Sequence, residues 1–362
     1  MLEENKNLSL LALLAFVIAS LFFLVSCASA QNKNLLSERE RYKLAADYSK
    51  NYRGLSVLII KGDRVVFEEY HNGHSVETPH QLASGTKSFA GVLAIAAQED
   101  KILKLGERVS DTITEWKADD KKSKTTIRQL LNLTSGLDTG FNGRPPIYQE
   151  AINFPAKYDA GKTFEYGPVP FQVFGEVLRR KLAPKKESVL DYLKRRILNP
   201  IGLNVANWTE QNGQVNLPSG AFLTAREWAK FGQFLKNSGR WNGKQIVSKK
   251  LLDECFGGTK TNPNYGLTFW LNRSFDQSAN VAEKTNGRNQ DLQNRLGIEP
   301  ETTRICKDGI SPDLPKDLLM AAGAGKQRLY VIPSLDLVVV RQGRQSRFDD
   351  REFLERLLTG KK

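Results

Sequence analysis

The sequence has very little histidine, cysteine or methionine. Its 362 residues include three histidines, three cysteines and two methionines. The histidines, His71, His74 and His80, all lie within ten residues beside a predicted hairpin, which disfavours a histidine-based catalytic triad. Their spacing matches no known zinc motif, and no cysteine or acidic residue stands at ligand spacing. We therefore expect no metal site and no cofactor.

The only long run without charge is at the N-terminus. Residues 8–25 are mostly Leu, Ala, Phe and Val, and the run continues into Leu24-Val25-Ser26-Cys27. An apolar stretch that ends in small residues is typical of an export signal. The four-residue run resembles a bacterial lipobox, which implies that Cys27 is lipidated and becomes the mature N-terminus.

We therefore expect a signal peptide at 1–26, a tether at 27–36 and one domain at 37–362. The implied location is the cell envelope, on the outer membrane or in the periplasm, with the protein anchored to a membrane by lipid. Two alternatives stay open. Ala28-Ser29-Ala30 is also a possible cleavage site of a secreted protein, and residues 8–25 are just long enough for an uncleaved transmembrane anchor.

The chain is basic, with a formal net charge of +13 at pH 7. The lysines and arginines are scattered along the sequence, and an exported protein does not meet DNA, so we expect no nucleic-acid partner. A basic face suits anionic lipid or an envelope polymer. With Cys27 assigned to lipid, Cys255 and Cys306 remain. They either form a disulfide outside the cytoplasm or are two unrelated buried thiols.

Strand patterns lie near both ends of the domain and helical patterns lie between them. We expect helices at 36–50, 84–99 and 348–358, and a helix capped by Thr224. We expect strands at 55–60, 65–70, 265–271, 328–332 and 335–341, a mainly helical region at about 107–260 and an irregular segment at 276–314. This order predicts an α+β fold in which hairpins from both ends form one antiparallel sheet, flanked by helices and an inserted helical region. The active site would lie in the cleft between the two parts.

Ser84-Gly85-Thr86-Lys87 is the only Ser-x-x-Lys in the chain. At the start of a helix, residues i and i+3 share a face, so the Ser84 hydroxyl and the Lys87 amine would meet. A buried lysine can give up its own proton and then accept one from Ser84. The alternative for this tetrapeptide alone is a capping serine followed by a solvated lysine.

Several further motifs follow Ser84 in a characteristic order. Residues 81–89 read QLASGTKSF and residues 126–138 read TIRQLLNLTSGLD. Together with segments 106–111, 160–166, 199–203, 220–226, 239–246, 265–270 and 322–333, they resemble the serine β-lactamase-related superfamily. The resemblance spans roughly residues 37–345 and is strongest to class C β-lactamases and their esterase and 6-aminohexanoate-dimer-hydrolase relatives.

The resemblance implies a role for three further residues. Tyr166 would be the second-motif tyrosine, which relays the proton to the leaving group and later activates water. Gly323 would let the strand approach the substrate closely, and the N–H groups of Ala324 and Ser84 would form the oxyanion hole. Gln172 and Gln327 are polar residues in matching segments, and the two alternatives for each are a place in the pocket lining and a place on the surface.

Two positions depart from the family pattern. Pro168 stands where an asparagine often follows the tyrosine, and Ala321 stands where the third motif often begins with Lys, His or Trp. We therefore expect a serine hydrolase that cleaves an ester or amide of a small-molecule or oligomeric substrate. The alternatives are a peptidoglycan DD-peptidase or weak β-lactamase, a non-catalytic envelope-binding lipoprotein on the same fold, and a secreted basic protein that binds an anionic polymer.

Overall fold

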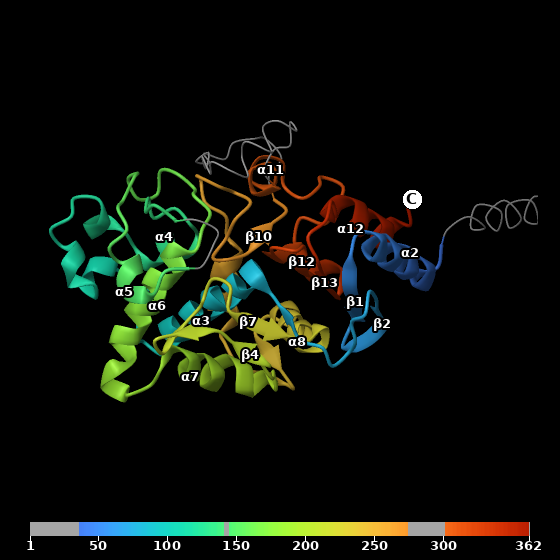
Figure 1. Ribbon diagram of the computed structural model, residues 1–362, viewed down its shortest axis with the longest axis horizontal. Helices are drawn as coiled ribbons and strands as arrows, with labels where there is room; N and C mark the ends of the chain where they lie inside the picture. Colours follow the sequence, from blue (N-terminus) through green and yellow to red (C-terminus); the bar gives the residue numbers. More distant parts are fainter. Residues whose placement is uncertain (1–35, 141–144, 274–300, 362) are drawn as a thin grey trace, which may run out of the picture.

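The computed structural model describes residues 36–140, 145–273 and 301–361 (Figure 1). Within these residues, six strands form the main sheet, and every neighbouring pair is antiparallel. Their order is β10-β11-β12-β13-β1-β2. Their bounds are β1 Gly54–Lys61, β2 Arg64–Tyr70, β10 Trp270–Leu271, β11 Leu319–Gly323, β12 Gln327–Ile332 and β13 Leu337–Gly343. The predicted α+β fold, with a sheet built from both ends of the chain, is confirmed.

Helices cover both faces of this sheet, which explains why its central strands are apolar on both sides. Gly232 of α8 (Ala225–Lys236) lies against the side chain of Leu329, whereas Phe353 of α12 (Asp350–Thr359) stacks on Tyr330. Consecutive residues of a strand point to opposite faces, so α8 and α12 lie on opposite sides. Helix α2 (Glu38–Asn51) packs beside α12 (Figure 1).

The capping residues predicted from sequence begin their helices. Ser37 and Glu40 form a complete capping box at the start of α2, in which each side chain accepts a hydrogen bond from the backbone N–H of the other residue. The Thr224 hydroxyl accepts from the N–H of Glu227 at the start of α8. The expected helices at 36–50 and 348–358 correspond to α2 and α12.

A helix-rich region lies between the two groups of sheet strands in the sequence. Besides α8 and α3 (Lys87–Glu99), its α-helices are α4 Ile127–Leu131, α5 Tyr148–Ala151, α6 Val169–Leu182, α7 Val189–Leu193 and α9 Lys249–Leu252. Short strands accompany them: β3 His80–Gln81, β4 Asn207–Trp208, β5 Glu210–Gln211, β6 Gln214–Val215, β7 Ala221–Leu223, β8 Arg240–Trp241 and β9 Lys244–Gln245. Strands β3, β7 and β4 form a small second sheet that adjoins the segment before Ser84.

Two expected elements differ from the structure, and one strand was not expected. The expected strand at 265–271 is wrong for most of its length, because Thr268 has a φ of +74° and Gly266 N–H donates to the Phe269 carbonyl, which ends the extended run. Only its last two residues form a strand, β10 (Trp270–Leu271). The expected irregular segment at 276–314 contains the helix α11 (Glu301–Asp308), and residues 274–300 lie outside the described residues. Strand β11 was not expected as a separate strand.

Helix α3 (Lys87–Glu99) lies at the centre of the molecule. Every residue from Lys87 to Ala97 is buried, because the helix has packed elements on all sides. Its Phe89 ring stacks on Phe231 of α8 at 4.0 Å between centroids. The predicted helix at 84–99 therefore begins as the 3₁₀ turn η2 (Ala83–Thr86) and continues as α3.

Both described cysteines are free and buried. Cys255 lies in the 3₁₀ turn Asp253–Phe256, and Cys306 lies in α11, where its sulfur accepts from Asn262 Nδ2 at 3.0 Å. Burial raises the pKa of the Cys255 thiol, and it raises the pKa of Cys306 to about 12. The disulfide considered for this pair is therefore not formed, and the alternative of two separate buried thiols describes the structure.

Within the described ranges, no helix is both long and apolar enough to cross a membrane. The apolar N-terminal stretch and Cys27 lie outside the described residues.

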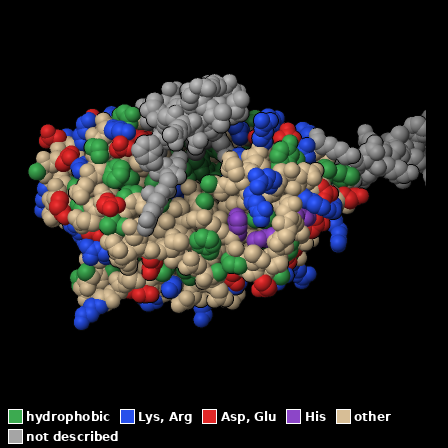
Figure 2. Space-filling model, in the orientation of Figure 1, with side chains coloured by type: hydrophobic (Ala, Val, Ile, Leu, Met, Phe, Trp, Pro, Cys, Tyr) green, Lys and Arg blue, Asp and Glu red, His purple; other side chains and the backbone are tan. Residues whose placement is uncertain are grey.

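The histidines gather on one face of the molecule (Figure 2). The rings of His74 and His80 lie 5.9 Å apart. The Nε2 atom of His74 is 3.2 Å from Gln342 Oε1, and that of His80 is 3.2 Å from the Gly343 carbonyl oxygen. In the part of the chain that the structure describes, no three His, Cys, Asp or Glu side chains are placed to hold a metal ion. The contacts of His74 and His80 with Gln342 and Gly343 therefore join the segment before Ser84 to the end of β13.

The histidine pair should make stability depend on pH. Burial lowers the pKa of His74 and of His80 below the usual value, so the unfolded chain binds more protons than the folded chain between pH 6.5 and the folded pKa. Stability should be full above pH 6.5 and fall as the pH drops towards 5. Between pH 7.5 and 5, the Tm of the His74→Gln/His80→Gln variant should fall by less than the Tm of the parent. Equal losses in the two proteins would contradict this assignment.

Candidate active site

Ser84 lies in a turn that two neighbouring elements hold in place. The preceding Ala83 has a φ of +47°, a strained conformation for a residue with a side chain. Leu82 N–H donates to the Ala221 carbonyl of β7 at 2.9 Å, and Ala221 N–H donates back to the Thr86 hydroxyl at 3.2 Å. The turn is therefore fixed to the small second sheet, and Ser84 is presented to a cavity rather than buried in α3.

Lys87 faces Ser84 as the i, i+3 spacing predicts. Its Nζ atom lies 3.0 Å from Ser84 Oγ and donates a second hydrogen bond to the Pro218 carbonyl at 3.2 Å. Lys87 is only 3% exposed. The alternative of a solvated lysine is therefore not what the structure shows. Burial disfavours the charged form of an amine, which suits a proton acceptor.

Tyr166 lies beside this pair, in the segment just before α6. Its ring stacks on Trp270 at 5.5 Å between centroids, and the Lys87 Nζ atom lies 5.0 Å from the Tyr166 ring centroid. The Thr139 hydroxyl holds the segment by donating to the Tyr166 carbonyl at 3.3 Å. Trp270 was not recognised as a site residue from the sequence, although it ends one of the quoted motifs.

Gly323, at the end of β11, lies directly against the turn that carries Ser84. A Cβ atom at this position would lie 2.0 Å from the Leu82 carbonyl oxygen and 2.9 Å from the Gly85 nitrogen. No side chain fits in that space. The absence of a side chain at Gly323 thus brings the backbone of β11 and the Ala324 amide to the same cavity wall as Ser84.

Replacing Gly323 by alanine should impair both folding stability and catalysis. The added methyl group must push β11 away from the Ser84 turn, at a cost of about 1–3 kcal/mol. Any shift of the Ala324 amide should lower kcat/KM by roughly 100-fold, as loss of one oxyanion donor does. The matched control is Gly106→Ala, because a Cβ there meets nothing within 4 Å. Ester hydrolysis and thermal unfolding measure both effects, and a fully active Gly323→Ala protein would refute the close approach.

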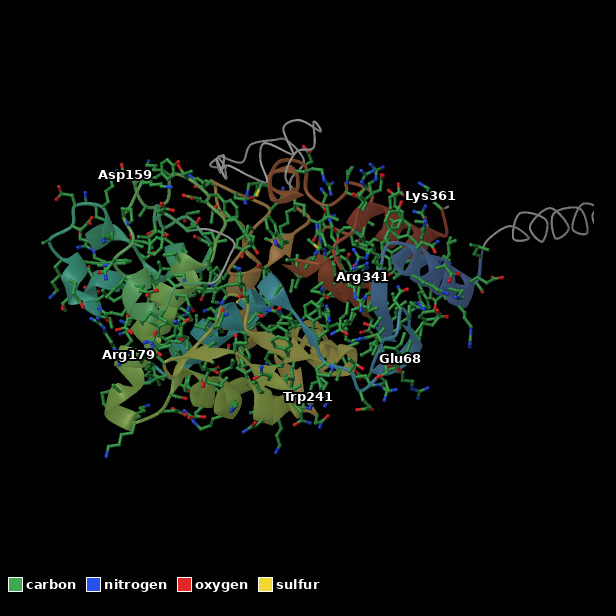
Figure 3. All side chains as sticks on the ribbon, in the orientation of Figure 1. Glu68, Asp159, Arg179, Trp241, Arg341 and Lys361 are labelled. Carbon is green, nitrogen blue, oxygen red and sulfur yellow. The ribbon has the colours of Figure 1, made fainter. Side chains whose placement is uncertain are left out.

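Two buried side chains, Gln327 and Arg341, hold the turn that follows Gly323. Gln327 Nε2 donates to the Ala324 carbonyl at 3.3 Å and to the Gly343 carbonyl at 2.5 Å. Arg341 donates to the Lys326 carbonyl at 2.6 Å, and its place inside the molecule is visible in Figure 3. Burial lowers the pKa of Arg341 to about 10, so it remains charged at neutral pH.

Neither glutamine suggested from the sequence is among the described residues of the cavity wall. Gln327 is 2% exposed and holds the turn from behind. Gln172 is also buried, and its Nε2 donates to the Pro146 carbonyl at 2.7 Å. The pocket-lining alternative is therefore wrong for both, and so is the surface alternative.

Ser84, Lys87, Tyr166, Gly323 and Ala324 all line one cavity of about 750 Å³. The cavity lies between the helix-rich region and the sheet, as the sequence predicted. Prolines and aromatic residues supply part of its apolar lining: Pro145, Pro168, Pro218, Trp270 and Phe348. Pro168 is the first of the two departures from the family pattern. It contributes an apolar surface to the cavity at a position where the family often has an asparagine.

The fold and the Ser-x-x-Lys pair define a serine hydrolase of the β-lactamase/transpeptidase-like class. The family model described as Beta-lactamase matches residues 36–342, and the chain belongs to this family.

Known proteins are similar to this chain in sequence or in fold. An uncharacterised protein of Alkalihalophilus pseudofirmus is 25% identical over 316 residues, which cover 80% of this chain and 83% of the relative. The structure is similar to that of a Bacillus anthracis protein provisionally described as a 6-aminohexanoate-dimer hydrolase, with a TM-score of 0.65, 17% identity and coverage of 86% and 79% of the two chains. It is also similar to a D-stereospecific amidohydrolase from Streptomyces, with a TM-score of 0.61, 12% identity and coverage of 90% and 100%. At these identities the two structures show the fold alone.

Proposed function

We propose that this chain cleaves an ester or amide bond through an acyl-enzyme on Ser84. The observation that carries the proposal is the 3.0 Å contact between the Ser84 hydroxyl and the buried Lys87 amine, on the wall of a cavity of about 750 Å³. A serine hydroxyl is a weak nucleophile unless a nearby base accepts its proton. Lys87 is the base that the geometry offers.

In the first step, Ser84 Oγ forms a bond to the substrate carbonyl carbon and its proton passes to the Lys87 amine, which must be unprotonated to accept it. The Pro218 carbonyl keeps the amine directed at Ser84. The carbonyl oxygen becomes an oxyanion, which the N–H groups of Ser84 and Ala324 would stabilise. The bond to the leaving alcohol or amine then breaks, and Tyr166 passes it the proton. Water attacks the acyl-enzyme in the second half-reaction and releases the acid.

Two probes distinguish ester or amide cleavage from the alternatives of a DD-peptidase and a weak β-lactamase. The full-length protein is assayed on 4-nitrophenyl butyrate and, separately, incubated with a fluorescent penicillin. The proposal expects ester turnover without stable penicillin labelling. Stable labelling without ester turnover would favour a DD-peptidase. Inertness towards both probes, and towards activated acyl phosphonates, would contradict the proposal and favour a binding lipoprotein.

We also propose that lipid on Cys27 holds the catalytic domain at a membrane surface. The support is the Leu-Val-Ser-Cys run after an uncharged apolar stretch, with the domain beginning at α2 a few residues further on. In a bacterial host grown with a radiolabelled fatty acid, the parent should be labelled and fractionate with membranes. Cys27→Ser should lose the label. A parent protein without label, recovered in the soluble fraction, would favour ordinary secretion instead.

A further inference from the structure

The two N–H groups that would form the oxyanion hole belong to distant parts of the chain. Ser84 lies in the turn η2 that follows β3, and Ala324 lies in the turn between β11 and β12. One oxygen atom accepts from both groups only if the two amides are held at the right separation. The contacts that fix this separation therefore matter for the chemistry, even where they lie outside the cavity.

The turn that carries Ala324 needs support from its surroundings. Gly325 has a φ of +76° and Lys326 a φ of +62°, so two consecutive residues are left-handed. Lys326 has a side chain, so its conformation is strained and persists only where neighbouring groups enforce it. The Ala324 carbonyl accepts from Gln327 Nε2 at 3.3 Å, and Arg341 donates to the next-but-one carbonyl at 2.6 Å. These two side chains therefore determine where the turn lies.

Gln327 also joins this turn to Gly343, the last residue of β13. Its Nε2 atom donates to the Gly343 carbonyl at 2.5 Å, and its Oε1 atom accepts from the Gly343 N–H at 3.0 Å. Both ends of the buried amide group are thus bonded to backbone. The amide has one possible orientation, because turning it by half a rotation would set donor against donor and acceptor against acceptor. Gln327 therefore holds Ala324 in a fixed position relative to Gly343.

His80 holds the segment before Ser84 to the same residue. Its Nε2 atom lies 3.2 Å from the Gly343 carbonyl oxygen. A carbonyl oxygen only accepts, so Nε2 carries a proton and donates it to this hydrogen bond. His80 belongs to β3, which pairs with β7 and runs directly into the turn η2. The Gly343 carbonyl thus accepts from Gln327 on the side of the β11–β12 turn and from His80 on the side of Ser84.

We propose that Gln327 and His80 are positioning residues for the oxyanion hole. Through the shared Gly343 carbonyl they set the separation of the Ser84 and Ala324 amides. Neither side chain belongs to the described lining of the cavity, so neither touches the substrate. The proposal rests on the proposed hydrolysis at Ser84. Their loss should weaken stabilisation of the negative charge that develops on the carbonyl oxygen, and leave binding of the neutral ester unchanged.

Gln327→Leu tests the first positioning residue. Leucine fills the buried space without the hydrogen bonds, so kcat on 4-nitrophenyl butyrate should fall by roughly 100-fold. KM should change by less than about twofold, because both half-reactions form an oxyanion at the same place and slow together. Gln98→Leu is the matched control, since Gln98 also donates to a side chain and accepts from a backbone N–H, at the end of α3 away from Lys87. It should lose stability and keep its kcat.

His80→Leu and His80→Gln test the second positioning residue, and they decide the proposal if Gln327→Leu does not fold. His80 is only partly buried, so both variants should fold. Glutamine places an N–H near the position of the histidine Nε2 and restores the bond to the Gly343 carbonyl, whereas leucine has no donor. In His80→Leu, kcat should fall by roughly tenfold, and in His80→Gln it should return to within about threefold of the parent. Equal kcat in the two variants would overturn the role of His80.

Phenylboronic acid reports on the oxyanion hole without turnover. Its boron accepts an electron pair from Ser84 Oγ while the serine proton passes to Lys87, so a B–O bond forms and the O–H bond breaks. The tetrahedral adduct is an anion with one boronate oxygen at the oxyanion position, as in a transition-state analogue. Its Kd should rise by roughly 100-fold in Gln327→Leu and stay at the parental value in Gln98→Leu. Unchanged Kd and kcat in Gln327→Leu, or equal losses in Gln98→Leu, would overturn the positioning role.

The boronate also separates this proposal from the proposed function. If the parent binds phenylboronic acid at Ser84 but turns over no ester, only the hydrolytic function fails, and the Kd values still decide the positioning role. Ser84→Ala shows whether the binding is at Ser84. Ester turnover that is unaffected in Gln327→Leu and His80→Leu would overturn the positioning role alone. A parent that neither binds the boronate nor turns over an ester would overturn both proposals.

Discussion

Replacing Ser84 by alanine should lower kcat/KM for ester hydrolysis by about four orders of magnitude or more, because the atom that forms the acyl bond is removed. The protein should remain folded. Ser84 Oγ accepts one hydrogen bond from Lys87 at the edge of a cavity, so its loss should change the free energy of unfolding by about 1 kcal/mol or less. Initial rates on 4-nitrophenyl butyrate and thermal unfolding provide the two measurements.

Ser88→Ala is the matched control for this substitution. Ser88 lies one turn further along α3, is buried, and donates to the Gly85 carbonyl at 2.7 Å. It is not part of the described cavity wall. This variant should lose about 1 kcal/mol of stability and keep most of its activity. Equal losses of activity at the two serines would indicate damage to α3 rather than loss of a nucleophile.

Replacing Lys87 by methionine should lower kcat by about three orders of magnitude. Methionine has nearly the same length and fills the same buried space, but it accepts no proton from Ser84. The Pro218 carbonyl loses its Lys87 donor as well, so some stability should be lost. The defect should be in kcat rather than in KM, because Lys87 acts on the serine and not on the bound substrate.

Lys236→Met controls for the loss of a buried lysine. The Lys236 side chain is 3% exposed, and it pairs with Asp336 and donates to the Gly62 carbonyl at 2.5 Å, away from the cavity. This variant should lose stability and keep its activity. Full activity in Lys87→Met would show that another group takes the proton from Ser84.

Much of the fold could be predicted because local patterns and tertiary packing agree. In β1 and β13 the apolar runs pair in register, with Ile59 opposite Val339, and the sheet buries them on both faces. The Ser37 capping box fixes the start of α2 from four residues of sequence, Ser37 to Glu40. The Ser84 and Lys87 contact follows from a single helical turn. The capping box and the Ser84–Lys87 contact depend on near neighbours in the chain, so the sequence is enough to predict them.

Other features depend on segments that are far apart in the chain. The expected strand at 265–271 looked continuous, but Thr268 adopts a left-handed backbone conformation there. The Pro218 partner of Lys87 is a backbone carbonyl, for which side-chain patterns give no signal. Arg304, Lys326 and Arg347 are far apart in the sequence, and only the fold brings them to the wall of one cavity.

The central claim is that a substrate acyl group becomes bonded to Ser84. The most direct test is intact-mass measurement of full-length protein mixed with a 4-nitrophenyl ester and quenched in acid within the first turnover, followed by peptide mapping. Tyr166→Phe protein, in which water activation should be slower, gives the intermediate more time to accumulate. The account predicts a mass increase equal to the acyl group, located on the peptide that contains Ser84 and missing in Ser84→Ala. Hydrolysis that continues in Ser84→Ala, or an acyl group located only on another residue, would contradict it.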